Sequence, residues 1–73
     1  NNLIMHEDAL NFGDNKYSII IDDDVWIGSN SIIMAGTYLG KGCVVSAGSV
    51  INGKFENYSI IGGNPGRVIK KRF

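Results

Sequence analysis

The fold is decided by the stretch from Ile21 to Ile51, IDDDVWIGSNSIIMAGTYLGKGCVVSAGSVI. An isoleucine, leucine or valine recurs there every six residues, at Ile21, Ile27, Ile33, Leu39, Val45 and Ile51. The fourth residue after each of these anchors is small or medium in size, with one exception: Val25, Ser31, Thr37, Cys43, Ser49 and the larger Phe55. A period of six does not keep the anchors on one face of an α-helix. The stretch is also far longer than a typical single strand of about five or six residues. The pattern therefore predicts one short strand per hexad, with a turn between strands.

Three hexads make one triangular coil of eighteen residues, so residues 21–38 and 39–56 are predicted to form two stacked coils. The anchors then form inward-facing columns, with Ile21 over Leu39, Ile27 over Val45 and Ile33 over Ile51. Neighbouring coils are expected at the usual inter-strand spacing of about 4.8 Å. The predicted fold class is an all-β, parallel β-helix. The general rule for parallel crossovers favours a right-handed coil.

The whole chain is predicted to be one β-helix domain, with a partial coil and a loop at 1–18, regular coils at 19–56 and a C-terminal cap at 57–73. In the cap, Asn57 and Tyr58 are expected to leave the coil. A short strand is predicted from Ser59 to Gly63, followed by a turn at Asn64-Pro65-Gly66. The basic end from Arg67 to Arg72 is compatible with a helical turn or a strand.

Composition excludes several function classes and indicates how a small chain is stabilised. The 73 residues carry seven basic and seven acidic side chains, so no net charge indicates nucleic-acid binding. The apolar runs are too short to span a bilayer, and no signal peptide is visible, so we expect a cytoplasmic protein. The single Cys43 excludes an internal disulfide, occupies an inward slot and is interpreted as a core residue. Oligomerisation remains as the device that stabilises so small a domain.

Three motifs resemble one known family, the bacterial hexapeptide-repeat acetyltransferases of the maltose, galactoside and polysaccharide O-acetyltransferase type. They are Val25-Trp26-Ile27-Gly28, Ala47-Gly48-Ser49-Val50 and the segment GNPGRVI at residues 63–69. The resemblance covers residues 17–71 and implies a left-handed coil. It also implies a homotrimer with acyl-CoA bound between neighbouring β-helices. The implied activity is transfer of an acetyl group from acetyl-CoA to a hydroxyl of a sugar or cell-surface polysaccharide, with no metal.

The resemblance and the chemistry together suggest site residues. A hydroxyl that attacks a thioester must lose its proton, and imidazole suits this task near neutral pH. His6, the single histidine, is the candidate base, with Glu7 or Asp8 to orient it. Backbone amides near Gly28 and Ser29 are candidate donors to the oxyanion. The positions that match the family's cofactor side are Trp26, Ser29, Ala47, Gly48, Lys54, Arg67 and Lys70.

The sequence departs from the family pattern at two places. Asn52-Gly53-Lys54 lacks the usual threonine-lysine pair, and Glu56-Asn57 replaces a common double proline. These changes affect the expected phosphate contacts and the rigidity of that loop.

Each functional interpretation has a structural alternative. His6 can be a surface histidine, Gly28 and Ser29 ordinary corner residues, and the basic end a solvated tail. At the level of the protein, one alternative is a non-catalytic β-helix that oligomerises a sugar nucleotidyltransferase. Another is an N-acetyltransferase acting on an amino sugar, for which the same base would serve. A zinc enzyme of the γ-carbonic anhydrase type requires three histidines, whereas this chain has one.

Overall fold

The computed structural model describes residues 17–73, and within them the chain forms nine strands. Six strands of two residues follow the repeat: β1 (Ile20–Ile21), β2 (Trp26–Ile27), β3 (Ile32–Ile33), β4 (Tyr38–Leu39), β5 (Val44–Val45) and β6 (Val50–Ile51). Three further strands complete the chain: β7 (Lys54–Phe55), β8 (Ser59–Gly63) and β9 (Gly66–Lys71). Among the described residues no helix is long and apolar enough to cross a membrane.

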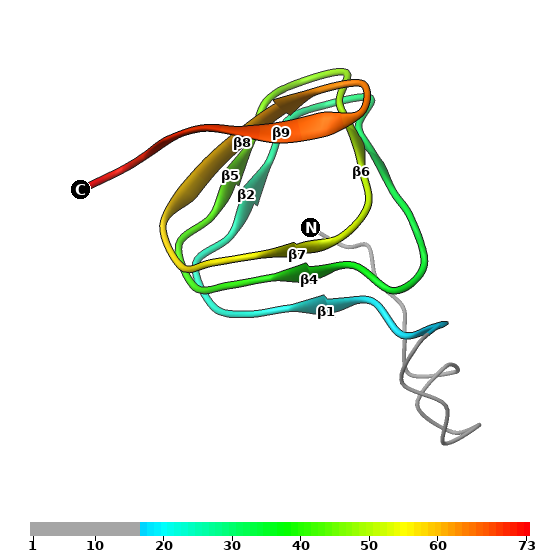
Figure 1. Cartoon of the computed structure of the whole chain (residues 1–73), viewed down its shortest axis with the longest axis horizontal. Helices are drawn as coiled ribbons and strands as arrows, with labels where there is room; N and C mark the ends of the chain where they lie inside the picture. Colours follow the sequence, from blue (N-terminus) through cyan, green and yellow to red (C-terminus); the bar gives the residue numbers. More distant parts are fainter. Residues whose placement is uncertain (1–16) are drawn as a thin grey trace.

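The strands wind into a three-sided parallel coil, whose nearly triangular outline is visible in Figure 1. Its sides are the sheets β1-β4-β7, β2-β5-β8-β9 and β3-β6. The first two passes pair in parallel with a separation of eighteen residues: Ile21 lies beside Leu39, Ile27 beside Val45, and Ile33 beside Ile51. The three columns predicted from the repeat of six are therefore confirmed.

The second pass, from Leu39 to Phe55, is two residues shorter than the repeat predicts. Leu39 pairs with Phe55 and Val45 pairs with Ile61, so the separation falls from eighteen residues to sixteen. The cause is the connection between β6 and β7, which contains only Asn52 and Gly53, whereas four residues connect β3 to β4. The repeat of six is thus interrupted after Ile51 and resumes with Phe55 and Ile61.

Asn57 and Tyr58 do not leave the coil as expected. They form the turn between β7 and β8, and β8 continues the coil in parallel with β5. The expected strand from Ser59 to Gly63 is confirmed as β8. The following segment is a strand rather than a helical turn, because β9 folds back antiparallel on β8 after a turn at Asn64 and Pro65. Gly66 then covers one end of the core: a Cβ added there would lie 2.5 Å from Ile51 Cδ1.

The interior contains one aliphatic column per side and small side chains next to the corners. Leu39, Val45, Ile51 and Ile61 are completely buried, and so is Cys43, as predicted. Three of the four buried hydroxyls among the described residues donate to main-chain carbonyls, as buried polar groups usually do. The pairs are Thr37 Oγ1 with Ile51 O at 3.3 Å, Ser49 Oγ with Ser46 O at 2.7 Å, and Ser59 Oγ with Glu56 O at 2.7 Å. The exception is Ser18 Oγ, which has no hydrogen-bond partner in this part of the chain.

We predict that stability depends on the inward columns and not on the outward positions of the same strands. Ile51 is completely buried, whereas Ile32 in the paired strand is 58% exposed. Ile51→Ala should lower the free energy of unfolding by about 2–5 kcal/mol, because it leaves a cavity in a packed core. Ile32→Ala is the matched control and should cost less than half as much. Urea denaturation followed by circular dichroism measures both, and equal losses would contradict the assignment of the inward face.

Candidate functional site

The segments that carry the three sequence motifs stack on one another at a single corner of the coil. We call residues 28–30, 46–49 and 62–66 the stacked corner. Gly48 N donates to Ser29 O at 2.9 Å, which joins the first two segments. Gly63 N donates to Ser49 Oγ at 3.1 Å, which joins the second to the third. Residues from three separate motifs are thus brought side by side by hydrogen bonds between consecutive coils.

Small residues let the backbones of neighbouring coils approach closely within the stacked corner. They also leave few side-chain atoms projecting from its outer surface. A Cβ added at Gly28 would lie 2.5 Å from the backbone nitrogen of Ala47, so only glycine fits without a shift. Ser29, Ala47 and Gly48 form the exposed tips of two turns. A ligand that approaches this corner therefore meets backbone and short side chains. The arrangement suits an extended ligand with amide groups.

The structure removes one of the candidate oxyanion donors. Gly28 N already donates to Val45 O at 2.8 Å as part of the ladder between coils. Its N–H therefore points along the stack and is not directed outward to a substrate. Of the two amides suggested by the sequence, that of Ser29 is the remaining candidate.

Trp26 and Lys70 lie on the outer face of one sheet. Trp26 is 61% exposed and pairs with Val44 across β2 and β5. Val44 pairs with Ile60 of β8, and Ile60 lies opposite Lys70 of β9. Directly paired residues point to the same face of a sheet, so these four side chains form one outward row. Three inter-strand steps separate the backbones of Trp26 and Lys70 by about 14 Å.

Arg67 adjoins the stacked corner, whereas Lys54 does not. Arg67 is exposed and pairs with Gly62, which belongs to the third segment of the corner. Lys54 lies on β7, in a different sheet, where it pairs with Tyr38. Of the residues predicted for the cofactor side, the fold gathers Ser29, Ala47, Gly48 and Arg67 at one place. His6 and Glu7, the predicted catalytic residues, lie outside the described residues.

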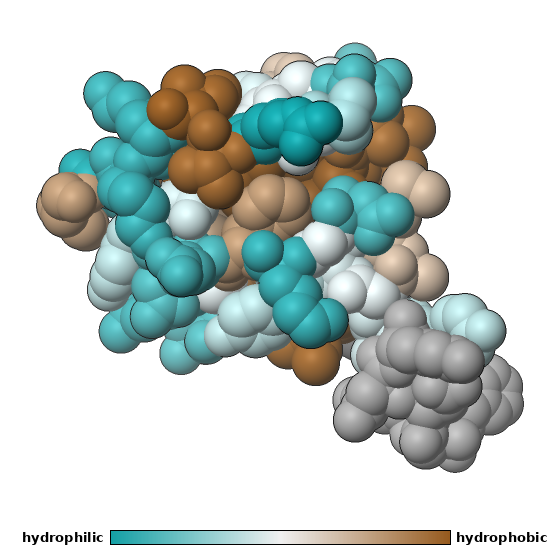
Figure 2. Space-filling view, in the orientation of Figure 1, coloured by the Kyte–Doolittle hydropathy of each residue, from teal (hydrophilic) through white to brown (hydrophobic). Residues whose placement is uncertain are grey.

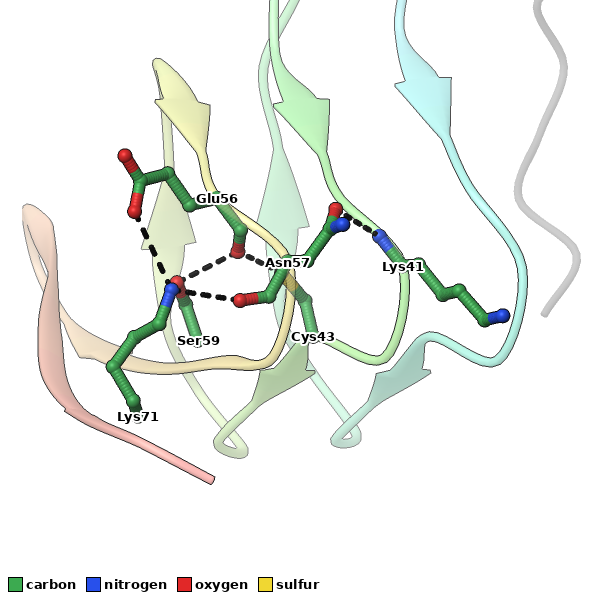
Figure 3. A network of polar contacts seen from close by, with 6 residues as sticks. All are labelled: Lys41, Cys43, Glu56, Asn57, Ser59 and Lys71. Atoms are coloured by element: carbon green, nitrogen blue, oxygen red, sulfur yellow. Dashed lines mark hydrogen bonds and ion pairs between the residues drawn. The ribbon is translucent and has the colours of Figure 1, made fainter. Parts of the chain in front are cut away.

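The turn between β7 and β8 is held by polar contacts that sequence reasoning missed (Figure 3). Asn57 Oδ1 accepts a hydrogen bond from Lys41 N at 2.9 Å. Lys71 Nζ donates to Asn57 O at 2.7 Å and lies 3.4 Å from Glu56 Oε1. Side-chain hydrogen bonds thus restrain the loop in which the family's double proline is replaced. The turn-forming tendency of asparagine was the available signal.

A shallow hollow beside that turn is separate from the stacked corner. Its volume is about 450 Å³, and its lining residues are Tyr38, Glu56, Asn57 and Lys71. In residues 17–73 no group of three or more histidine, cysteine, aspartate or glutamate side chains converges as metal ligands do. In the described part of the chain, four of the seven residues predicted for the cofactor side meet at the stacked corner.

Comparisons with known proteins agree with this architecture. The family described as bacterial transferase hexapeptide (six repeats) matches residues 18–53. A chloramphenicol acetyltransferase from Klebsiella aerogenes is 46% identical over 54 residues, which are 74% of this chain and 26% of that protein. A probable macrolide acetyltransferase from Lysinibacillus sphaericus is 47% identical over 58 residues, which are 80% of this chain and 32% of that protein. The chain spans about a quarter to a third of the length of these relatives.

Solved structures show the same coil. A hexapeptide-repeat acetyltransferase from Vibrio cholerae superposes with a TM-score of 0.73 at 40% identity, over 75% of this chain and 31% of that one. A serine acetyltransferase in complex with cysteine gives a TM-score of 0.74 over 80% of this chain and 23% of that one. At 22% identity, the latter likeness concerns the fold alone. These neighbours are left-handed β-helices, which confirms the predicted fold class and excludes the right-handed coil expected from general chirality. The chain is thus a left-handed β-helix built from hexapeptide repeats, and it is similar in sequence and structure to proteins named as acetyltransferases.

Proposed function

We propose that this protein transfers an acetyl group from acetyl-CoA to a hydroxyl group of a sugar or cell-surface polysaccharide. The observation that carries the proposal is the stacked corner, where Ser29, Ala47 and Gly48 form a low, exposed surface beside Arg67. The named relatives are acetyltransferases, which supports the reaction class.

The stacked corner and the neighbouring strand suit the two ends of CoA. Pantetheine is thin and carries amides, so it fits a surface of small residues with backbone polar groups. The nucleotide end carries phosphates, for which arginine and lysine are favourable partners. Arg67 and Lys70 are exposed on β9, and Trp26 lies in the same outward row as Lys70. Lys54 stays a prediction, since its place in the β1-β4-β7 sheet gives it no link to the corner.

The proposed chemistry is attack of the acceptor oxygen on the thioester carbon. His6 takes the hydroxyl proton as the C–O bond forms, and Glu7 or Asp8 holds the imidazole in the required orientation. The backbone amide of Ser29 is the proposed donor to the oxyanion of the tetrahedral intermediate. The C–S bond then breaks, and the proton on His6 passes to the departing CoA thiolate. No metal is needed for these steps.

We propose a homotrimer as the active assembly. Several large apolar side chains are exposed in the single chain, including Ile20, Trp26, Ile32, Met34 and Ile69, at 43–61% exposure. Figure 2 shows apolar side chains reaching the surface at more than one place on the visible face. Exposed apolar side chains of this size support association with further copies of the chain. A cytoplasmic location stays a prediction.

A second candidate differs in its acceptor. The relatives include proteins named chloramphenicol acetyltransferase and probable macrolide acetyltransferase, which favours a small antibiotic-like molecule as the acceptor. Another relative, from Staphylococcus aureus and 40% identical over 53 residues, is named an N-acetyltransferase, so an amine acceptor, such as an amino sugar, is the third possibility. A non-catalytic oligomerisation domain is the alternative from another class of function.

We expect CoA to bind at the stacked corner with one site per chain. Ala47→Leu should weaken binding at least tenfold, because a larger side chain at an exposed tip occupies the path of pantetheine. Ala35→Leu is the matched control: Ala35-Gly36 forms the same type of turn at another corner, with φ of +87° at Gly36 and +73° at Gly48. Calorimetric titration of CoA, with the oligomer mass measured in the same sample, tests this. Equal effects of the two variants would contradict the proposed location, and no binding by a trimer would favour the oligomerisation domain.

We expect His6→Ala to lower kcat by about 10²–10⁴-fold, the usual range for loss of a general base. The KM for acetyl-CoA should change less than about threefold, because the base acts on the acceptor proton rather than on the cofactor. Release of CoA thiol during turnover measures both constants. A panel with a hexose, an amino sugar and chloramphenicol as acceptors separates the three candidate acceptors. An unchanged kcat would exclude His6 as the base.

A further inference from the structure

Strand β9 is hydrogen-bonded to one neighbouring strand only, so its position also depends on contacts made by the residues at its C-terminal end. β9 is the outer strand of the order β2-β5-β8-β9, and it pairs with β8 alone. This pairing contains an irregularity between Ile60 and Ile61. Most residues of β9 are exposed, including Arg67 and Lys70. Edge strands with few buried side chains open more readily than core strands.

The last residue of β9 and the two residues after it attach to the turn between β7 and β8. We call Lys71, Arg72 and Phe73 the C-terminal clasp. Arg72 N donates to Tyr58 O at 2.7 Å, which extends the hydrogen bonding between β8 and β9. Arg72 Nη1 donates to Gly42 O at 2.9 Å, a carbonyl in the preceding coil. Arg72 therefore connects the end of β9 to two different coils.

Gly42 provides the space in which the side chains of Tyr58 and Arg72 pack against the turn. A side chain at residue 42 would collide with the ring of Tyr58, and the backbone there has φ of +73°, which L side chains rarely adopt. With glycine in place, the Tyr58 ring lies over the turn and meets the Phe73 ring edge-on, with centroids 5.1 Å apart. The guanidinium carbon of Arg72 lies 5.4 Å from the Phe73 centroid.

Among the clasp residues, Arg72 carries the attachment. Lys71 Nζ donates to Asn57 O and forms an ion pair with Glu56, but both contacts are exposed to solvent. Exposed charged contacts of this kind contribute little to stability. Phe73 is 89% exposed, so its ring contact buries little surface. The side-chain bond of Arg72 to Gly42 O is partly buried and involves a charged donor, which makes it stronger than a neutral hydrogen bond.

We propose that Arg72 is a positioning residue for CoA, which acts by holding β9 so that Arg67 and Lys70 are presented in fixed places to the phosphates. The inference rests on the proposed function, which assigns those two residues to the nucleotide end of CoA. Lys70 is two residues from Arg72, so release of the clasp frees the strand segment that carries this charge. A charged group held in place in advance loses less conformational entropy when the ligand binds.

The test compares acetyl-CoA with acetyl-pantetheine, which lacks the nucleotide. Arg72→Ala should raise the KM for acetyl-CoA by about threefold to tenfold, the size expected from one charge-assisted hydrogen bond that acts indirectly. The kcat/KM for acetyl-pantetheine should change less than twofold. Arg72→Lys keeps a donor for Gly42 O and should restore most of the affinity. Lys71→Ala removes a neighbouring cation whose contacts, with Asn57 O and Glu56, are both exposed, so its KM for acetyl-CoA should change less than about twofold. An equal fall in kcat/KM for acetyl-CoA and for acetyl-pantetheine would overturn the proposal, because it would indicate a general effect of Arg72→Ala on the fold.

Hydrogen exchange of the wild-type protein and of Arg72→Ala separates this inference from the proposed function. The amides of β9 should exchange faster in the variant, and those of Val45 and Ile51 should not change. Unchanged exchange in β9 would overturn the inference, whatever happens to CoA. Faster exchange in β9, together with a wild-type protein that does not use acetyl-CoA, would contradict the proposed function and with it the link from Arg72 to CoA. Faster exchange with the selective rise in KM supports both.

Discussion

The structure depends on backbone hydrogen bonds that join each coil to the next in register. Ile20 N donates to Thr37 O at 2.9 Å, Trp26 N to Cys43 O at 3.0 Å, and Ile32 N to Ser49 O at 2.8 Å. The described strands of the repeat are only two residues long, so no strand could supply this bonding within itself. Each pass must therefore return to the same three sides and turn at the same three corners. The inward columns, the small corner residues and the position of the stacked corner all follow from that constraint.

The repeating part of the fold could be predicted from the sequence, because the return of each coil to the same three sides requires an aliphatic residue at every sixth position. Anchors six residues apart predicted three sides, and columns eighteen residues apart followed, as with Ile27 and Val45. The length of the second pass was not predictable in this way, since Asn52 and Gly53 shorten one corner by two residues. Beyond this point Phe55 and Ile61 again lie six residues apart and face inward, but both come two residues earlier than the unbroken repeat would place them.

The same constraint explains which part of the candidate site could be predicted. Ser29 and Ala47 are eighteen residues apart, so the coil alone brings them to one corner. Arg67 lies next to the corner because β8 and β9 form an antiparallel hairpin, and the repeat of six does not predict this hairpin. The general rule for parallel crossovers predicted the wrong hand, because it was derived for crossovers packed against a sheet. Motif resemblance supplied the hand that physical reasoning missed. His6 and Glu7 lie outside both the repeat and the described residues.

The departure at Glu56-Asn57 shows how the corners tolerate change. Paired prolines restrict a turn through their fixed backbone angles. Here the turn is restrained by partners instead: Asn57 Oδ1 binds the main chain of Lys41, and the carbonyls of both residues accept further hydrogen bonds. The turn therefore keeps its place in the stack through hydrogen bonds rather than through prolines. In this β-helix the buried inward columns are thus separate from the corner tips and the exposed β9, where we propose that the ligand binds. Substitutions at those tips can alter binding while the coil is preserved.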